Sequence, residues 1–387
     1  MNKDIVLKLF NLVNVEINRD IIVYDDNFYK DFLSVPSLAL GEYYMNGKID
    51  IPNISSTLGK LMILKENYMR FVIMKTLGIR VIFLFRMFLN SWFKSFFSKL
   101  INYQSLIRSK EVAEVHYDLP RELYEMMLDD KMQYSCAYFN NLNVDLNIAQ
   151  RNKINLIINK LKIEDGMTII DIGCGFGTLC HTIASRYPNC KVIGVNISKS
   201  QLEWISDRVP QLDNLTFIEV DYRNLDIKCD RVVSVGMFEH VGKKNYDCYL
   251  KKINSILNDK GLALIHTIAN KVSREGSDEW INKYIFPGGR LPSPQEILDA
   301  SLETDLLIED VHNFGLDYAK TLFYWRQRFL DSYDNLRMLD PLFFDDVFRR
   351  RWIYYLGCCE SIFYYKNTIL LQMVFTKKWT KCYSGAR

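Results

Sequence analysis

The sequence predicts an α/β protein with a Rossmann-like, doubly wound parallel sheet and a smaller N-terminal domain. Apolar segments of strand length alternate with helical segments between residues 168 and 267. A glycine-rich turn, Gly173-Cys174-Gly175-Phe176-Gly177, directly follows the first of these strands and opens a helix. Before residue 116 the chain shows neither feature. Alternation of this kind is typical of a parallel sheet covered by helices on both faces.

The individual elements follow from the apolar pattern. We expect strands at residues 168–172, 192–196, 216–220, 232–235 and 262–267, and helices at residues 178–187, from Ser200, and at residues 246–257. Two later apolar runs, 306–312 and 370–376, would close the sheet as an antiparallel pair. The pattern predicts an N-terminal domain over 1–100, a polar linker over 101–115 and a second domain over 116–387 that contains the sheet.

Composition restricts the class of protein. The 387 residues are 49% apolar and 25% charged, which indicates a folded protein and not a disordered one. The net charge of +3 says little about partners. We expect no secretory signal, because the N-terminus lacks an apolar run of the needed length. The nine cysteines are then expected to be reduced thiols in a cytoplasmic protein, and none forms a cluster with zinc spacing, so no metal is expected.

Residues 60–110 differ from the rest of the chain in charge. They contain a single acid, Glu66, among basic residues at positions 60, 65, 70, 75, 80, 86, 94, 99, 108 and 110. No uninterrupted apolar run is long enough to span a membrane. Trp92, Phe93, Phe96, Phe97 and Leu100 fall on one face of a helix. This face either packs in the core of the N-terminal domain or lies on an anionic membrane.

The glycine turn is the strongest indication of a binding site. Gly173, Gly175 and Gly177 have G-x-G-x-G spacing, whereas a dinucleotide fold needs G-x-G-x-x-G to fit a pyrophosphate. The acid Asp171 lies two residues before the first glycine and suits a cationic or amine-bearing ligand. This spacing, together with Asn196 further on, disfavours a nicotinamide-dependent oxidoreductase.

The next two strands end on residues suited to a nucleoside. Asn196 ends the second strand and can donate to and accept from ribose hydroxyls. Gln201 either completes an S-x-x-Q capping box with Ser198 or contacts the ligand. The third strand ends at Asp221-Tyr222-Arg223, where an adenine edge would lie.

Several longer motifs occur in one order along the chain. They are His116-Tyr117-Asp118-Leu119, Met132-Gln133-Tyr134-Ser135-Cys136, Asp171-Ile172-Gly173-Cys174-Gly175, Gly236-Met237-Phe238-Glu239-His240-Val241-Gly242, His266-Thr267-Ile268, Trp280-Ile281-Asn282-Lys283-Tyr284-Ile285-Phe286-Pro287, and His312-Asn313-Phe314-Gly315 with Asp317-Tyr318. Over residues 113–376 this set resembles the cyclopropane-fatty-acyl-phospholipid synthases, relatives of the mycolic acid cyclopropane synthases.

The resemblance implies that residues 116–387 form a catalytic domain with a methyltransferase-type sheet, and that the N-terminal domain over 1–100 contacts lipid or membrane. It also implies the following reaction. The methyl group of S-adenosylmethionine is attacked by a cis double bond of a phospholipid acyl chain, and proton loss closes a cyclopropane. It implies bicarbonate as the base, held by Cys136, Glu239, His266, the Ile268 backbone and Tyr318. Around the cofactor it implies Tyr134, Ser135, Asp171, Gly173, Gly175, Gly177, Asn196, Gln201, Tyr222 and Arg223. It also suggests a homodimer in peripheral contact with the inner face of an anionic membrane, and no nucleic acid.

The sequence departs from the family pattern at a few positions, and alternative functions remain open. Pro120-Arg121 stands where relatives more often carry Gly-Asn, and Phe139 and Phe176 replace tryptophans. With Tyr134 and Tyr138, Phe139 is a candidate ring for stabilising a developing cation.

The alternative enzyme is a lipid methyltransferase that gives a methyl-branched or methylene product. A catalytically inactive lipid-binding protein is disfavoured, because the residues assigned to the bicarbonate are all present.

Overall fold

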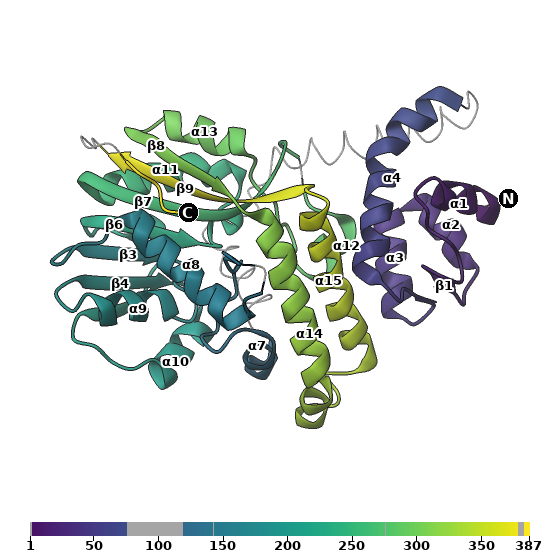
Figure 1. The fold of residues 1–387 in the computed structure, drawn as a ribbon, viewed down its shortest axis with the longest axis horizontal. Helices are drawn as coiled ribbons and strands as arrows, with labels where there is room; N and C mark the ends of the chain where they lie inside the picture. The colour runs from purple at the N-terminus through teal and green to yellow at the C-terminus, as the bar shows by residue number, and fades with distance from the viewer. Residues whose placement is uncertain (1, 76–118, 142, 275, 378–382) are drawn as a thin grey trace. The chain divides into compact units, whose positions relative to one another are not determined.

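The computed structural model describes residues 2–75, 119–141, 143–274, 276–377 and 383–387. Internal contacts divide the chain into two compact units (Figure 1). The N-terminal unit comprises Met1–Asn102, Glu275–Gly288 and Trp325–Lys366, and the sheet unit comprises Tyr103–Arg274, Gly289–Tyr324 and Asn367–Arg387. The predicted linker, 101–115, lies outside the described residues, as does most of the aromatic segment that begins at residue 69.

The sheet unit is built on seven strands in the order β5-β4-β3-β6-β7-β9-β8. Their bounds are β3 (Thr168–Ile172), β4 (Lys191–Asn196), β5 (Leu215–Glu219), β6 (Cys229–Val235), β7 (Leu257–Asn270), β8 (Leu306–Asn313) and β9 (Thr368–Lys377). The first five in chain order pair in parallel, and β9 runs antiparallel to both β7 and β8. The predicted Rossmann-like α/β class is therefore confirmed, and β8 and β9 form the predicted antiparallel closure.

Helices cover both faces of this sheet. They are α7 (Arg121–Met127), α8 (Leu146–Leu161), α9 (Thr178–Arg186), α10 (Lys199–Arg208), α11 (Tyr246–Ile256) and α13 (Pro294–Leu302), with the short 3-10 turns η1 (Tyr222–Asn224), η2 (Phe238–His240) and η3 (Lys243–Asn245). One apolar core joins α11 and α13 to the sheet, and the other joins α8, α9 and α10 to it. Central strands such as β4 read as continuous apolar runs because both of their faces are buried.

Side-chain caps fix where several of these helices start. Asp145 accepts from Ile148 N at the start of α8. Ser293 and Glu296 form a complete capping box on α13. Such caps satisfy backbone N–H groups that have no partner in the helix, and each typically contributes about 1 kcal/mol. The helix starts in the sheet unit are therefore encoded locally.

The N-terminal unit is mainly helical. It contains α1 (Asn2–Asn11), α2 (Asn27–Ser34), α3 (Pro36–Met45), α4 (Ile54–Lys75), α12 (Glu279–Tyr284), α15 (Asp346–Tyr364), the part of α14 (Gly315–Leu339) from Trp325 onward, and the short strands β1 (Ile22–Val23) and β2 (Ile49–Asp50). Trp280 of α12 packs directly on α3, where a Cβ added to Gly41 would lie 2.1 Å from its ring. The guanidinium of Arg350 in α15 donates to the carbonyl of Tyr44 in α3.

These contacts change the domain boundary expected from the sequence. The predicted first domain ended at residue 100, whereas two later segments of the chain belong to the same unit. Their buried side chains, including Trp280, Trp352 and Tyr354, complete an apolar core that the N-terminal helices alone would leave open. The continuous domain over 116–387 is therefore interrupted twice.

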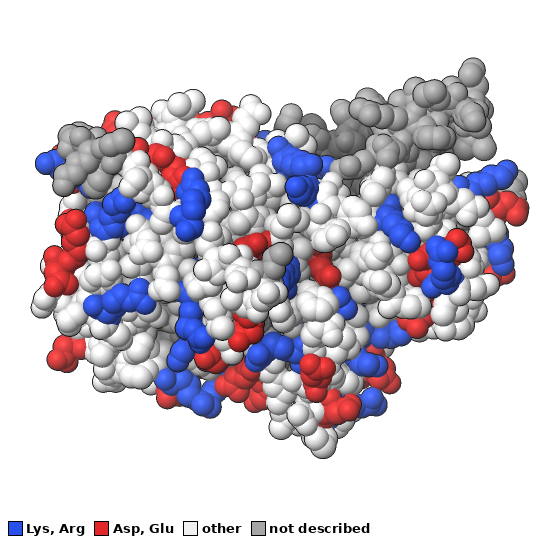
Figure 2. Space-filling view, in the orientation of Figure 1, with Lys and Arg blue, Asp and Glu red and all other residues white. Residues whose placement is uncertain are grey.

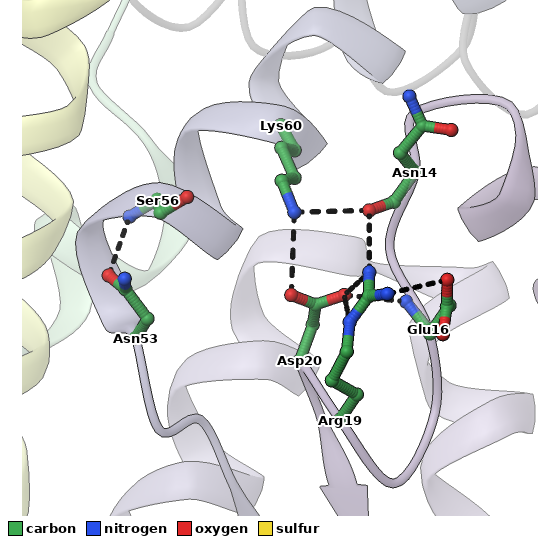
Figure 3. Close-up of polar contacts among 7 residues, drawn as sticks. All are labelled: Asn14, Glu16, Arg19, Asp20, Asn53, Ser56 and Lys60. Atoms are coloured by element: carbon green, nitrogen blue, oxygen red, sulfur yellow. Dashed lines mark hydrogen bonds and ion pairs between the residues drawn. The ribbon is translucent and has the colours of Figure 1, made fainter.

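A polar cluster ties the loop after α1 to α4 (Figure 3). Lys60 Nζ donates to the carbonyl of Asn14 and lies 3.4 Å from Asp20 Oδ1. Arg19 pairs with the same carboxylate and with Glu16. Lys60 belongs to the basic segment 60–110, and it is held by an acid of its own unit.

Charge is mixed over the surface that Figure 2 shows, with acidic and basic side chains interspersed. Within the described part of the chain, no helix has the length and apolar character needed to cross a membrane. The Trp92–Leu100 face and the basic residues Arg86, Lys94 and Lys99 lie outside it, so the choice between core and membrane stays a prediction.

Candidate active site

A cavity opens at the carboxyl ends of the parallel strands in the sheet unit. Its wall is formed by residues that follow β3, β4, β5 and β6, together with the segment 132–135 and side chains of α8. The chain reverses its direction of winding between β3 and β6. Ligands of open α/β sheets bind outside such a switch point. The described part of the chain contains no group of three or more possible metal ligands.

The glycine turn forms the base of this cavity. Gly173, Gly175 and Gly177 have φ angles of +82°, +55° and +78°, which side chains with a Cβ rarely adopt. Beside Gly175 no described atom lies within 4 Å of where a Cβ would be, so the backbone there is open to a ligand. Gly177 differs from its predicted role: Phe217 fills the space beside it, so it shapes the turn and does not line the cavity.

The other predicted cofactor residues all line the cavity. They are Tyr134, Ser135, Asp171, Gly173, Gly175, Asn196, Gln201, Tyr222 and Arg223. These residues come from four separate segments of the chain, 134–135, 171–175, 196–201 and 222–223. The structure thus brings together nine of the ten positions that the sequence assigned to the cofactor.

Asn196 holds two of these segments in place. Its Nδ2 donates to the Gly175 carbonyl at 3.2 Å and to Gln201 Oε1 at 2.9 Å, and its Oδ1 accepts from Ile197 N and Ser198 N. Ser198 caps α10, but the Gln201 side chain turns to Asn196 and does not complete the predicted capping box. Asn196 therefore anchors the glycine turn, and Gln201 keeps its amide NH₂ for a ligand.

At the place predicted for the adenine edge, Arg223 and Asp221 form an ion pair. Arg223 donates to both carboxylate oxygens of Asp221, at 2.8 and 2.6 Å, and its guanidinium lies 5.3 Å from the Tyr222 ring centroid. The bidentate pair, at the end of β5, holds the loop that carries Tyr222. The Tyr222 ring is itself buried against Tyr249.

Two buried charged groups stand at the cavity without an ion-pair partner among the described residues. Burial raises the pKa of Asp171 from 3.8 to about 7, against a lowering effect of Cys180 and Lys153. Burial lowers the pKa of Lys153 from 10.5 to about 8, although Asp129 and Asp171 favour its charged form. Lys153 was not predicted from the sequence. Its position among the buried residues of α8 is the feature that could have indicated it.

The predicted bicarbonate holders Glu239 and His266 lie on neighbouring elements, Glu239 in the turn η2 after β6 and His266 in β7, opposite the last residue of β6. Glu239 Oε1 accepts from Ile268 N at 2.6 Å, and burial raises the pKa of Glu239 to about 7. His266 Nδ1 lies 3.1 Å from Gln372 Nε2. Glu239 Oε2 and His266 Nε2 are buried and have no hydrogen-bond partner among the described residues.

The Ile268 backbone, predicted to hold the bicarbonate, contacts another predicted holder. Its N–H donates to Glu239 Oε1. Because a backbone N–H is a single donor, it now orients a carboxylate of the site. Ile268 acts on the site through Glu239 in this structure.

Cys136 and Tyr318 are brought to adjacent segments. Residues on either side of Tyr318 bind the backbone beyond Cys136: Asp317 accepts from Phe139 N at 2.8 Å, and Thr321 Oγ1 accepts from Ala137 N at 3.1 Å. The Cys136 thiol is buried, donates to the Ala137 carbonyl, and burial raises its pKa well above the ordinary value. It is therefore a neutral thiol and not a nucleophilic thiolate.

The candidate cation-stabilising rings divide into two groups. Tyr134 lines the cavity, and Tyr138 joins a cluster in which Phe314 lies 5.6 Å, centroid to centroid, from His266. Phe139 is stacked on Tyr324, and Lys320 Nζ lies 4.3 Å from its centroid. Its prediction as a cation-stabilising ring is not supported, because a protein cation already occupies one face.

The fold and the cavity define the class as S-adenosylmethionine-dependent methyltransferase. A crystal structure of a mycolic acid cyclopropane synthase complexed with S-adenosylhomocysteine (SAH) and CTAB matches 69% of this chain and 98% of that one, with 28% identity and a TM-score of 0.64. Coclaurine N-methyltransferase bound to SAH shares the fold, at 23% identity and a TM-score of 0.61 over 69% of this chain and 82% of that one.

The chain belongs to the mycolic acid cyclopropane synthetase family, whose model matches residues 104–373. It is 39% identical over 366 residues to the cyclopropane-fatty-acyl-phospholipid synthase of Escherichia coli strain K12, covering 94% of this chain and 90% of the relative. It is 34% identical to the tuberculostearic acid methyltransferase of Mycobacterium tuberculosis, covering 64% of this chain and 61% of the relative.

Proposed function

We propose that this protein transfers a methylene group from S-adenosylmethionine to a cis double bond of a phospholipid acyl chain, forming a cyclopropane. The observation that carries the proposal is the extent of similarity to the E. coli synthase, which covers 94% of the chain. That match continues outside residues 104–373 of the family model. The match to the tuberculostearic acid methyltransferase covers only 64% of the chain.

The chemistry requires three things of the protein. The alkene carbon forms a bond to the methyl carbon as the carbon–sulfur bond breaks, leaving S-adenosylhomocysteine. The resulting cation loses one proton and closes the ring, so the lipid gains one CH₂ overall. An unactivated alkene is a weak nucleophile, and the enzyme must hold it against the methyl group and stabilise positive charge. Tyr134 and the Tyr138–Phe314 cluster supply aromatic faces next to the cavity and the His266 site.

The residues around His266 fit a bound bicarbonate. Within the described part of the chain, one nitrogen of His266 and one oxygen of Glu239 are buried without partners, and a buried unpaired polar atom is costly unless a ligand satisfies it. His266 would donate to the anion, and Glu239 would accept its O–H. When bound, bicarbonate supplies a base at a site without a strong protein nucleophile. The Cys136 thiol and Tyr318 would complete this site.

The test is an incubation with S-adenosylmethionine and vesicles of unsaturated phospholipid, followed by mass spectrometry. We expect a lipid product heavier by one CH₂ that resists catalytic hydrogenation. A product that takes up hydrogen would mean a methylene lipid, and a saturated product without a ring by NMR would mean a methyl branch. An Asp171→Asn variant is the control for cofactor dependence, since its cavity loses the buried carboxylate. No modified lipid from the parent protein would overturn the proposal.

The proposal includes a membrane partner and a second copy of the chain. The substrate double bond lies inside the bilayer, so the protein must reach the membrane surface and admit an acyl chain. We propose peripheral docking on anionic lipid from the cytoplasmic side, and a homodimer. Vesicle sedimentation and light scattering would test these two parts separately.

A further inference from the structure

Gln372 is the cross-strand partner of His266. The two residues are paired in the antiparallel register of β7 and β9, and Gln372 Nε2 lies 3.1 Å from His266 Nδ1. Both side chains are almost completely buried, with exposed fractions of 0% for Gln372 and 1% for His266. Because both side chains are enclosed, neither can take water as an alternative hydrogen-bond partner. The hydrogen bond between them therefore fixes both orientations.

We infer that Gln372 is a positioning residue that fixes the tautomer of His266, with Nδ1 as acceptor and Nε2–H as the donor to the reaction site. The amide of Gln372 donates to Nδ1, which must then carry a lone pair. A neutral imidazole has one ring proton, so that proton resides on Nε2.

The imidazole is neutral in this environment. Burial lowers the pKa of His266 well below its ordinary value, and the positive charges of Lys153 and Lys160 lower it further. The Glu239 carboxylate accepts from Ile268 N, and burial raises its own pKa to about 7. Among the described residues no ionised partner of His266 therefore favours an imidazolium, and only the two neutral tautomers compete.

The opposite tautomer would leave the site with the wrong polarity. If Gln372 presented its Oε1 to an Nδ1–H group, His266 Nε2 would carry a lone pair. The two unpartnered atoms of the site, His266 Nε2 and Glu239 Oε2, would then both be acceptors when Glu239 is ionised. Two acceptors repel an anion, whereas one donor and one acceptor match a protonated oxyanion. This step rests on the proposed function, but the tautomer itself is independent of it.

The sheet explains why a glutamine stands at this position. Neighbouring β9 residues such as Leu371, Met373 and Val374 are apolar and buried, so an amide there needs a specific partner. Gln372 Oε1 finds none among the described residues, which means that the amide is retained at a cost. Its Nε2 contact with His266 is the interaction that offsets this cost.

The experiment measures the two ring nitrogens of His266 directly. The chain has five histidines, so a ¹⁵N-histidine-labelled sample can be assigned with one His266→Asn variant. In the parent protein we expect an unprotonated Nδ1 and a protonated Nε2 for His266. A protonated Nδ1 with a bare Nε2 would overturn the inference, whatever the activity of the sample.

Two substitutions separate positioning from stability. Gln372→Glu supplies an acceptor in place of a donor, and should move the proton to Nδ1 or produce the imidazolium. Gln372→Leu removes the donor, and should give a tautomer mixture and a kcat lower by about 10- to 100-fold, as for other groups that orient a functional histidine. Thr376→Val is the matched control, since it alters another buried polar residue of β9 away from His266.

The results test the role of Gln372 separately from the proposed function. A reversed tautomer or an imidazolium in Gln372→Glu, with folding and cofactor affinity retained, supports the inference. Parent-like nitrogen shifts and turnover in Gln372→Leu overturn it, as does an equal loss in Thr376→Val. If the parent protein shows the expected tautomer but forms no modified lipid, the proposed function fails and the assignment of Gln372 stands.

Discussion

Lys153 Nζ lies 2.6 Å from the hydroxyl oxygen of Ser135, so a buried ammonium group stands in the wall of the cofactor cavity. On the same wall is Asp171, buried and without an ion pair in the described residues. A cavity with one cationic and one anionic group that form no ion pair with each other suits a ligand with both charges. The amino-acid end of S-adenosylmethionine has an α-carboxylate and an α-ammonium group.

The first prediction concerns Lys153. Lys153→Met keeps most of the side-chain volume but removes the charge and the hydrogen bond to Ser135. We expect the affinity for S-adenosylhomocysteine to fall by about tenfold to a hundredfold, as removal of a hydrogen bond to a charged group costs roughly 1.5–3 kcal/mol. Calorimetric titration measures this change. Lys191→Gln, at an exposed position of β4, is the control. Equal affinities of parent and Lys153→Met would show that the ammonium does not face the ligand.

The second prediction concerns the pH dependence of cofactor binding. With a pKa of about 7, the Asp171 carboxyl of the free protein is largely protonated at about pH 6. A cationic ligand favours the carboxylate, so binding should release a proton there, and affinity should rise as the pH increases towards about 7. Above the Lys153 pKa of about 8 the ammonium is lost, and affinity should fall again. Titrations in buffers of different ionisation enthalpy measure the protons exchanged.

As the pH rises, the raised pKa of Asp171 should change folding stability in the opposite direction to cofactor affinity. The folded-state pKa of Asp171 lies above its ordinary value of 3.8, so between these values the folded chain binds more protons than the unfolded one. Its contribution to the free energy of unfolding is present at low pH and is lost as the pH rises through about 7. We expect Asp171→Asn to raise the melting temperature of the ligand-free protein at about pH 8, and to abolish the proton release on binding at about pH 6. A lower melting temperature would show that the carboxylate has a stabilising partner.

The third prediction separates binding from turnover. Glu239→Gln and His266→Asn should keep cofactor affinity near the parent value, since neither residue lines the cofactor cavity. Turnover should fall by about 10²–10⁴-fold, the usual contribution of a group that assists proton transfer. Added bicarbonate should partly restore whichever variant still binds it weakly. Near-parent turnover in both variants would remove these residues from the proton-transfer site.

The sequence predicted the sheet because its strands are buried on both faces and the glycine turn has a demanding backbone. Residues 168–172 and 262–267 lie within β3 and β7, and nine of ten cofactor positions meet at one cavity. These predictions are local, since a strand end or a positive φ depends on a few adjacent residues.

What could not be predicted depends on long-range partners. The contact of Gln372 with His266 depends on the pairing of β9 with β7, because Gln372 lies 106 residues after His266 in the chain. The hydrogen bond from Ile268 N–H to Glu239 was not predicted, because no sequence pattern shows that these two residues meet. The domain boundary was wrong in position because Trp280 packs in the N-terminal unit, where its ring nitrogen donates to Met45, 235 residues earlier in the chain.

The last prediction concerns membrane docking by the basic segment 60–110. Lys60, the residue of that set whose side chain the structure describes, pairs with Asp20 (Figure 3), so docking would depend on the others. Each basic residue close to an anionic surface contributes about 1 kcal/mol, and aromatic side chains favour the interface. Replacing Arg86, Lys94 and Lys99 with Gln should weaken binding to anionic vesicles more than to zwitterionic ones. The difference should shrink as salt rises, because screening removes the contribution of the charges. A matched variant with Lys191, Lys251 and Lys260 changed to Gln carries the same loss of charge on exposed positions of the sheet unit. If both triple variants sediment equally with anionic vesicles at low salt, net charge and not this segment governs docking.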